Sequence, residues 1–493
     1  MKEAFNNYKY LDLQSKNIEE RIEQFDNKLY LEFGGKLLLD SHASRVLPGF
    51  DPSAKLNLLL KLREKIEILL VLSARDIEKN KLHADLGISY DQDILRLIDL
   101  YRSYNFLVKN VVITHYNEQA NAKRFRDKLT KLGICVSCHY IIKNYPNDVD
   151  SIISENGFGK NDYIKTEREL VVITAPGPGS GKLAVALSQI YHDSKHNIKS
   201  GYAKFETFPI WNLAPNHPIN LAYEAATADL NDQNMIDPFH LKKYKKEATN
   251  YNRDIEAFPV LNSLFERIYG DSPYSSPTDM GVNMAGFCIE DEEKAIIASK
   301  KEIIRRYFHA MVDLKKDIGT IKSVKKIEDI LKKNNINYSL NEAITEAHLL
   351  SITTEMPAVT ISLSDNYIVR GKTSDLLGPS SAALLNALKY LAKIPKEIDL
   401  LEPSVIKLVQ DLKINYLHNQ NPRLHMNETL IVLSASAEKN ENAKKAMLSI
   451  PKLKNADAHS TVILSETDVE IFSRLGIFLT EDPKYEKNRF YHK

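Results

Sequence analysis

The stretch "VVITAPGPGSGKLAVALSQIYHD" (residues 171–193) carries the signal that decides the fold. An apolar, β-branched run predicts a buried strand, a glycine-rich turn follows it, and the apolar spacing after Lys182 predicts a helix. Strand, tight turn and helix in this order are typical of α/β proteins. The turn itself has two interpretations: it binds an anion, or it is a plain corner between two elements.

The chain around this stretch repeats the same alternation of strand-like and helical segments. Strand-like runs include "IEILLVLSA" (66–74), "NVVITHY" (110–116), "ICVSCHYI" (134–141) and "GYAKFE" (201–206), with helical patterns between them. Such a series predicts parallel strands with helices on both faces of the sheet. The predicted fold class is therefore α/β, with an N-terminal, mostly parallel, Rossmann-like sheet that carries a glycine-rich phosphate-type loop.

Changes in sequence character predict three domains. A long polar region and helix-rich runs fill residues 221–320, which predicts a mainly helical subdomain. Beyond it, "PAVTISLS" (357–364), "YIVRG" (367–371), "TLIVLSA" (429–435) and "TVILSE" (461–466) are strand-like and interleaved with helices. We therefore expect an N-terminal α/β domain (1–220), the helical subdomain (221–320) and a C-terminal α/β domain (321–493).

Composition excludes several classes of partner. Lys and Arg total 66 and Asp and Glu total 65 in 493 residues, so no bulk charge attracts nucleic acid or a membrane surface. No apolar run approaches the roughly 20 residues of a membrane helix, and the three cysteines form no disulfide framework. We expect a cytoplasmic protein whose partner is a small molecule with a phosphate group, in a chain that forms homo-oligomers.

The glycine-rich turn has the composition of a phosphate-binding loop. Its glycines are expected to adopt positive φ, to bring backbone N–H groups close to an anion, and to point the positive end of the next helix at it. A lysine at the start of that helix adds a mobile positive charge. The predicted phosphate-binding residues are Gly177, Gly179, Ser180, Gly181 and Lys182.

The loop departs from the usual phosphate-loop pattern at two positions. Pro176 stands where the first glycine belongs, and Leu183 stands where a hydroxyl would bind Mg²⁺. The string "GPGSGK" resembles the loop of nucleoside monophosphate kinases, but Ala184 replaces their downstream threonine. Either Mg²⁺ is held elsewhere, or the loop binds phosphate without transferring it.

A dinucleotide-binding turn is the alternative interpretation of the same residues. Gly177, Gly179 and Gly181 follow a strand and open a helix, and Glu206 ends the next strand, where an acid binds a ribose hydroxyl. The third glycine of that fingerprint would fall on Lys182, and a lysine there suits a mononucleotide or a phosphorylated substrate better.

Four charged residues after the loop are candidates for chemistry. Asp229 and Asp232 have the spacing that places them on one face of a helix, where they would hold a metal or act as a base. Arg253 in "NYNRDIE" has the geometry to clamp a phosphate, and Glu206 is a further metal ligand or base. The alternative without chemistry is that the two aspartates lie on a solvated helix face and that Arg253 forms an ordinary ion pair.

Motifs of other enzyme classes are absent from the sequence. It contains no G-x-S-x-G elbow, no H-E-x-x-H helix and no paired histidine motif, so neither a hydrolase nor a zinc peptidase is predicted, and no motif predicts a dedicated metal site. Cys135 and Cys138 form C-x-x-C within a strand-like run, whose alternation directs them to opposite faces.

Long strings in the chain resemble one bacterial family. "TAPGPGSGK", "GYAKFETFPIW", "NLAYEAATADLNDQNMIDPFH" and "SPTDMGVNMAGF" are similar to the family catalogued as domain of unknown function 1846, or uncharacterised protein family 0371. The resemblance covers essentially the whole chain. It implies a bacterial cytosolic protein with an N-terminal α/β unit, a helical part and a C-terminal α/β part, and it supplies no catalytic residues.

These observations lead to one principal hypothesis and two alternatives. The principal one is a phosphotransferase that binds ATP or another phosphate ligand, with or without Mg²⁺, through residues 177–182. The alternatives are an oxidoreductase that uses NAD(P), and a non-catalytic oligomeric protein that a phosphate ligand stabilises.

Overall fold

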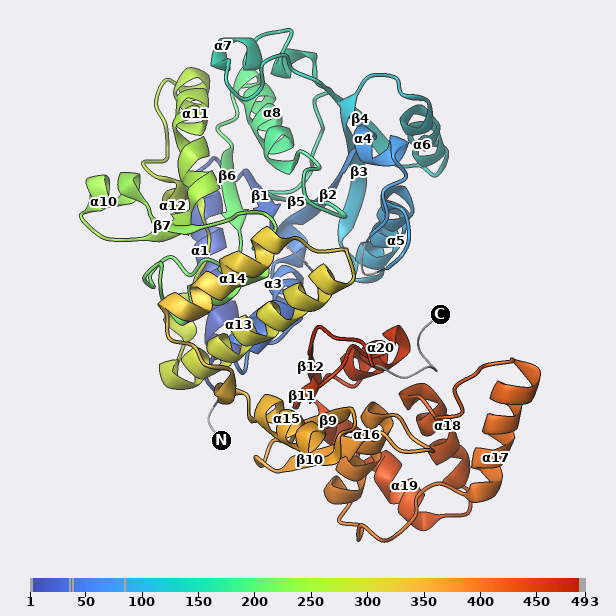
Figure 1. Cartoon of the computed structure of the whole chain (residues 1–493). Coiled ribbons are helices and arrows are strands. Elements are labelled where there is room, and N and C mark those ends of the chain that lie inside the picture. Colours follow the sequence, from blue (N-terminus) through green and yellow to red (C-terminus); the bar gives the residue numbers. More distant parts are fainter. Residues whose placement is uncertain (1–2, 35–36, 38–39, 84–85, 487–493) are drawn as a thin grey trace. The chain divides into compact units, whose positions relative to one another are not determined.

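The computed structural model describes all residues except 1–2, 35–36, 38–39, 84–85 and 487–493. The chain divides into two compact units (Figure 1). The first contains residues 1–224 and 232–299, and the second contains residues 225–231 and 300–493. The predicted division into three domains remains a prediction.

The first unit is built on a six-stranded sheet in which every pair of neighbouring strands is parallel. The strand order is β4-β3-β2-β5-β1-β6. Strands β2 and β5 are buried along their whole length, as expected where helices cover both faces of a sheet. This confirms the predicted parallel α/β architecture. The strands are β1 (Leu29–Phe33), β2 (Ile66–Ser73), β3 (Leu107–Tyr116), β4 (Cys135–Tyr140), β5 (Leu170–Thr174) and β6 (Gly201–Phe205).

Helices connect these strands, and a small two-stranded antiparallel sheet, β7 (Asn234–Ile236) with β8 (Thr249–Tyr251), follows them. Helix α8 begins directly after the glycine-rich turn and contacts β1, β5 and β6. The helices are α1 (Asn7–Glu23), α2 (Ser41–Val46), α3 (Ala54–Lys61), α4 (Ala74–Glu78), α5 (Tyr90–Ser103), α6 (Ala120–Lys131), α7 (Val149–Ile152), α8 (Lys182–Lys195), α9 (Pro218–Ala226), α10 (Pro238–Tyr244), α11 (Asn252–Tyr269) and α12 (Pro277–Met280).

The order of the strands reverses at the centre of the sheet. From β2 the chain proceeds through β3 to β4 at one edge, whereas from β5 it proceeds to β6 at the other edge. Ligands of open α/β sheets bind at such a reversal, outside the carboxyl ends of the strands. The turn after β5 therefore lies at the position where this architecture places a ligand.

The second unit contains a four-stranded mixed sheet in the order β10-β9-β11-β12. Strands β9 (Ala358–Ser362) and β10 (Ile368–Lys372) are antiparallel, and β11 (Asp457–Ser460) pairs in parallel with β12 (Phe478–Glu481). This confirms the predicted C-terminal α/β region. Its helices are α14 (Ile321–Lys333), α15 (Glu342–Thr354), α16 (Pro379–Leu391), α17 (Pro403–Asp411), α18 (Met426–Ser436), α19 (Glu441–Leu448) and α20 (Glu466–Arg474), and helix α13 (Glu292–Lys315) leads into them.

Two predicted strands of this unit are wrong. "TLIVLSA" lies within helix α18, where the backbone N–H of His425 donates to Glu428 in a capping box that starts a helix. Its buried residues, among them Met426, Thr429 and Leu433, have helical spacing. "TVILSE" lies outside the ladder because pairing ends at Ser460 and the more polar "DAHS" before it forms β11. In both cases apolar, β-branched composition predicted a strand, whereas helix capping in one segment and strand pairing in the other determined the actual secondary structure.

Within the described residues, no helix combines the length and the apolar character needed to cross a membrane.

Candidate functional site

The glycine-rich turn runs from the end of β5 to the first residue of α8. Gly179 and Gly181 have φ of +74° and +91°, a backbone conformation that only glycine adopts without strain. In the part of the chain that the structure describes, the amides of Gly179, Gly181 and Lys182 donate to no backbone or side-chain acceptor. Free donors at the start of a helix attract anions, because they add to the positive end of the helix dipole.

Gly177 has a different role from the one predicted. Its φ is not positive, so the expectation of a left-handed turn at this residue is wrong. A Cβ at this position would lie 2.2 Å from the hydroxyl oxygen of Tyr90 on α5. Glycine is therefore required here because the turn passes close to a neighbouring helix.

The far side of the turn is held by the end of β3. Thr114 Oγ1 donates a hydrogen bond of 2.6 Å to the carbonyl oxygen of Ser180. The Ser180 side chain is 3% exposed, and its hydroxyl has no hydrogen-bond partner among the described residues. A buried hydroxyl without a partner costs free energy unless a ligand or a water molecule satisfies it.

His115, next to Thr114, is strained. Its φ is +53°, at a point where the register between β3 and β4 shifts, and its Nδ1 lies 3.1 Å from Ser73 Oγ at the end of β2. Burial and then the Arg75 cation lower the pKa of His115. A strained residue and a bulge at the carboxyl edge of a sheet are typical of functional regions.

Lys182 is directed toward the sheet. Its Nζ lies 3.8 Å from Glu32 Oε1 on β1, and the two side chains are only 15% and 14% exposed. Tyr202 on β6 donates a hydrogen bond of 2.8 Å to the other carboxylate oxygen of Glu32. Because 3.8 Å exceeds hydrogen-bond length, Lys182 and Glu32 form an ion pair without a direct hydrogen bond.

Glu32 also belongs to a buried charge cluster beside β6. It lies opposite Lys204 across the β1 and β6 pair. Lys204 Nζ lies 2.7 Å from Asp254 Oδ2 on α11 and 3.2 Å from Glu206 Oε2. Burial alone lowers the pKa of Lys204, but the carboxylates of Glu206, Asp254 and Glu32 outweigh burial and raise it.

Glu206 has an unusual protonation equilibrium. Burial raises its pKa above the ordinary 4.5, Lys204 lowers it in part, and the neighbouring Asp254 raises it again. The cluster contains the cations Lys182, Lys204 and Arg253 and the four carboxylates Glu32, Glu206, Asp232 and Asp254. The cluster thus contains one more carboxylate than cations, and burial together with the neighbouring Asp254 raises the pKa of Glu206.

The structure brings together three of the four predicted catalytic residues. Arg253 Nη2 lies 3.5 Å from Asp232 Oδ2, and its Nε lies 4.0 Å from Asp254 Oδ1. Burial lowers the pKa of Arg253, but Asp232, Asp254 and Glu206 together raise it, so Arg253 also senses the charge of Glu206. Asp232, Arg253 and Glu206 thus belong to one cluster.

Asp229 does not follow this arrangement. Helix α9 ends at Ala226, so the prediction that Asp229 and Asp232 share a helix face is wrong. Asp229 is exposed in a turn that groups with the second unit, whereas Asp232 is buried in the first. Between them, Asn231 adopts a positive φ of 59°, a conformation that does not continue a helix.

A small pocket of about 60 Å³ opens onto the charge cluster. Lys204, Glu206 and Asp254 line it, together with polar residues of the loops that follow. Trp211 lines it too, and its Nε1 donates to the carbonyl oxygen of Asn283 at 2.9 Å, which fixes the ring under a loop. A volume this small admits a few water molecules or one reactive group, since pockets for drug-sized ligands measure roughly 300–1,000 Å³.

Sequence reasoning missed Glu32, Lys204 and Asp254. They come from three different segments, and no spacing motif connects all three. Lys204 and Glu206 occupy alternate positions of "GYAKFE", so they lie on one face of the strand. A polar pair of this kind at the end of a buried strand was the only available signal.

The fold and the site define a class: a two-unit α/β protein with a parallel sheet whose carboxyl edge carries buried opposite charges. The chain belongs to the DUF1846 family. The N-terminal part of "Domain of unknown function DUF1846" matches residues 3–335, and the C-terminal part matches residues 339–491. The resemblance of the quoted strings to this family is thereby confirmed.

Relatives match the chain along nearly its whole length. UPF0371 proteins of Streptococcus pyogenes serotypes M28 and M5 are each 54% identical over 490 residues, which covers 99% of this chain and 99% of theirs. A UPF0371 protein of Streptococcus uberis is 54% identical over 492 residues and is covered completely. The family is bacterial and uncharacterised, so these names assign no chemistry to the site.

Proposed function

We propose that this protein binds the phosphate group of a nucleotide or another phosphorylated small molecule through residues 177–182, and that it is a phosphotransferase. The observation that carries the proposal is the set of free amides of Gly179, Gly181 and Lys182 at the start of α8. The reversal of strand order after β5 and the buried Ser180 hydroxyl support the same location.

In this proposal the charge cluster performs the chemistry beside the bound phosphate. Lys182 neutralises negative charge on the phosphate, and Glu32 connects it to the cluster. Glu206, in its deprotonated form, accepts the proton of the attacking group, and its raised pKa makes it a stronger base than an ordinary carboxylate. The pocket admits only that group, so the rest of the ligand lies along the sheet edge.

Mg²⁺ fits this arrangement poorly. Leu183 stands where a hydroxyl would bind the ion, and Glu206 and Asp254 already pair with Lys204. The cations of the protein thus occupy the positions around the carboxylates, and no step is assigned to a metal here.

Lys182→Ala tests the proposal directly. A charged hydrogen bond to phosphate contributes about 1.5–3 kcal/mol, so this variant should bind its ligand roughly 10- to 100-fold more weakly. Isothermal titration with ATP, pyrophosphate and sugar phosphates, with and without Mg²⁺, measures the change.

Lys195→Ala is the matched control. Lys195 lies at the other end of α8, and its Nζ is also 3.8 Å from a carboxylate, that of Glu155. The Lys195→Ala variant should bind the phosphate ligand with the same affinity as the unmodified protein. Equal affinities of the two variants would reject the phosphate site.

The NAD(P) alternative is less well supported by the sheet. In dinucleotide-binding folds the acidic residue ends the strand adjacent to the glycine-rich turn, but β1 separates β6 from β5, about 9.6 Å away. Glu206 is also engaged by Lys204. Thermal stabilisation by a nicotinamide cofactor, lost in Glu206→Ala, would favour this alternative. Stabilisation by a phosphate ligand without any turnover would favour the non-catalytic oligomeric protein instead.

A further inference from the structure

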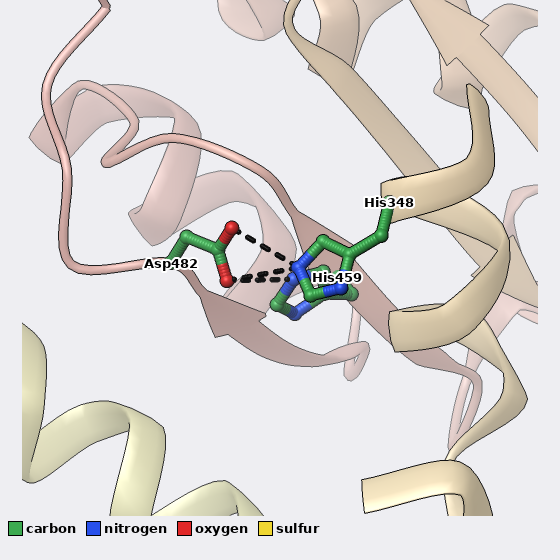
Figure 2. Close-up of side chains that lie close together, drawn as sticks. All are labelled: His348, His459 and Asp482. Carbon is green, nitrogen blue, oxygen red and sulfur yellow. Dashed lines mark hydrogen bonds and ion pairs between the residues drawn. The ribbon is translucent and has the colours of Figure 1, made fainter. Parts of the chain in front are cut away.

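Two histidines and an aspartate converge in the second unit, which is separate from the site proposed above. Figure 2 shows His348 of α15, His459 of β11 and Asp482, which directly follows β12. His348 Nε2 lies 3.1 and 3.0 Å from the two carboxylate oxygens of Asp482, and His459 Nε2 lies 3.3 Å from Oδ1. One potential ligand atom from each residue lies within 4.8 Å of the other two.

The hydrogen bonds around His459 determine where its proton lies. Thr480 Oγ1 donates its single hydrogen to the carbonyl oxygen of Ala458 at 3.0 Å. The contact of 2.8 Å between Thr480 Oγ1 and His459 Nδ1 must therefore have Nδ1 as the donor. Neutral imidazole has one N–H, so the Nε2 of His459 presents a lone pair.

That lone pair faces an acceptor. His459 is 0% exposed, and its Nε2 has no hydrogen-bond partner among the described residues, although Asp482 Oδ1 is 3.3 Å away. Two electron-rich atoms at this distance repel each other unless a cation lies between them. A proton on Nε2 is the simplest such cation, but at 3.3 Å it would make only a long hydrogen bond to Asp482 Oδ1.

A metal ion matches the observed separations better. A tetrahedral ion with ligands at about 2.0–2.1 Å separates its ligand atoms by about 3.3 Å, close to the spacing around Asp482. The two histidines offer ligand atoms within 4.8 Å of each other, and binding of an ion would require His348, whose side chain is 43% exposed, to rotate toward His459. Thr480 holds the tautomer of His459 in the manner of the outer residues that orient metal ligands.

We propose that the second unit binds one divalent transition-metal ion of the Zn²⁺ class through His348, His459 and Asp482. Two imidazoles and one carboxylate suit Zn²⁺ and Co²⁺, whereas Mg²⁺ and Ca²⁺ prefer all-oxygen ligands. Three protein ligands leave a fourth position for water or a substrate atom. Lys484 competes for the carboxylate at 3.9 Å, but its exposed side chain is able to withdraw into solvent.

No motif in the sequence predicts this metal site. His348 comes from helix α15, whereas His459 and Asp482 come from β11 and from the residue after β12, far from α15 along the chain. The parallel pairing of β11 with β12 brings His459 and Asp482 together, and α15 packs on β9 and β11.

The test is metal binding by the full-length protein after treatment with a chelator. The unmodified chain should bind one Zn²⁺ with an affinity measurable by competition with a chromophoric chelator. It should also bind Co²⁺ with visible absorption bands of nitrogen coordination, and it should not respond to Mg²⁺. His348→Ala should weaken Zn²⁺ binding at least tenfold and abolish the Co²⁺ bands. Asp482→Asn should give the same loss, as a second variant at a different ligand.

His418→Ala is the control, because His418 is an exposed histidine of the same unit. It should bind Zn²⁺ like the unmodified chain. The proposal is overturned if the unmodified chain binds no Zn²⁺, or if His348→Ala and His418→Ala bind it equally well. The first result would leave the cluster bridged by a proton alone, and the second would place the ion at other ligands.

Discussion

At the scale of single residues, Glu206 shows how burial shifts the pKa of an ordinary carboxylic acid side chain. The strand pattern of "GYAKFE" predicts that Glu206 ends a strand, and the structure places it there. Its raised pKa arises from burial, from Asp254 across the pocket and from the limited compensation by Lys204. Of these causes only Lys204 is visible in the local sequence, because Asp254 comes from helix α11 and burial depends on how the fold packs.

The raised pKa makes a prediction about stability. The folded protein holds the Glu206 proton to a higher pH than the unfolded chain, so the stabilisation from this group is complete below about pH 4.5 and is lost as the pH rises through the folded pKa. Relative to Glu206→Gln, the unmodified protein should therefore lose unfolding free energy as the pH increases from 4.5. Urea denaturation at a series of pH values measures this difference.

Glu256→Gln provides the comparison for that experiment. Glu256 is an exposed residue of the neighbouring helix α11, and its replacement should leave the pH dependence unchanged. The assignment would be contradicted if the free energy of unfolding of the unmodified protein, measured relative to that of Glu206→Gln, stayed constant or increased as the pH rises.

At the scale of elements, the turn after β5 combines two kinds of glycine. Gly179 and Gly181 serve the backbone conformation, whereas Gly177 serves close packing against Tyr90 of α5. The sequence predicts the turn and its glycines, but it does not distinguish these reasons. The distinction depends on where α5 lies. Helix α18 illustrates the same limit, since its apolar run was predicted as a strand and its capping box decides otherwise.

The packing role of Gly177 is open to a double-mutant test. Gly177→Ala should destabilise the protein by about 1–3 kcal/mol, because its Cβ would overlap the Tyr90 ring. In a Tyr90→Ala background the same change should cost measurably less, since the obstacle is gone. Chemical denaturation of the single and double variants gives the coupling free energy.

Gly179→Ala is the control for the double mutant. Its Cβ would meet nothing within 4 Å, so it introduces backbone strain alone and should not couple to Tyr90→Ala. Coupling of equal size at both glycines would show that Tyr90 acts through general stability and not through contact.

At the scale of the whole molecule, the two proposed sites belong to different units. Every residue invoked for phosphate lies in the first unit, and every proposed metal ligand lies in the second. Hydrogen exchange should therefore slow around α15, β11 and β12 when Zn²⁺ is added, and around residues 177–182 when a phosphate ligand is added. Mass spectrometry of peptic fragments reads both effects in one experiment. Zn²⁺ protection confined to the first unit would place the ion elsewhere.

The sequence by itself determined the α/β class, the parallel sheet, the glycine-rich turn and the membership of the family. These follow from local periodicity, from turn residues and from long similar strings, which neighbouring residues establish together. Only the tertiary structure decided that Glu32, Lys204 and Asp254 surround Glu206, that Asp229 stands apart, and that His348 reaches Asp482. The physical reason is that strand order and helix packing, and not spacing along the chain, determine which distant side chains share one volume and one electric field.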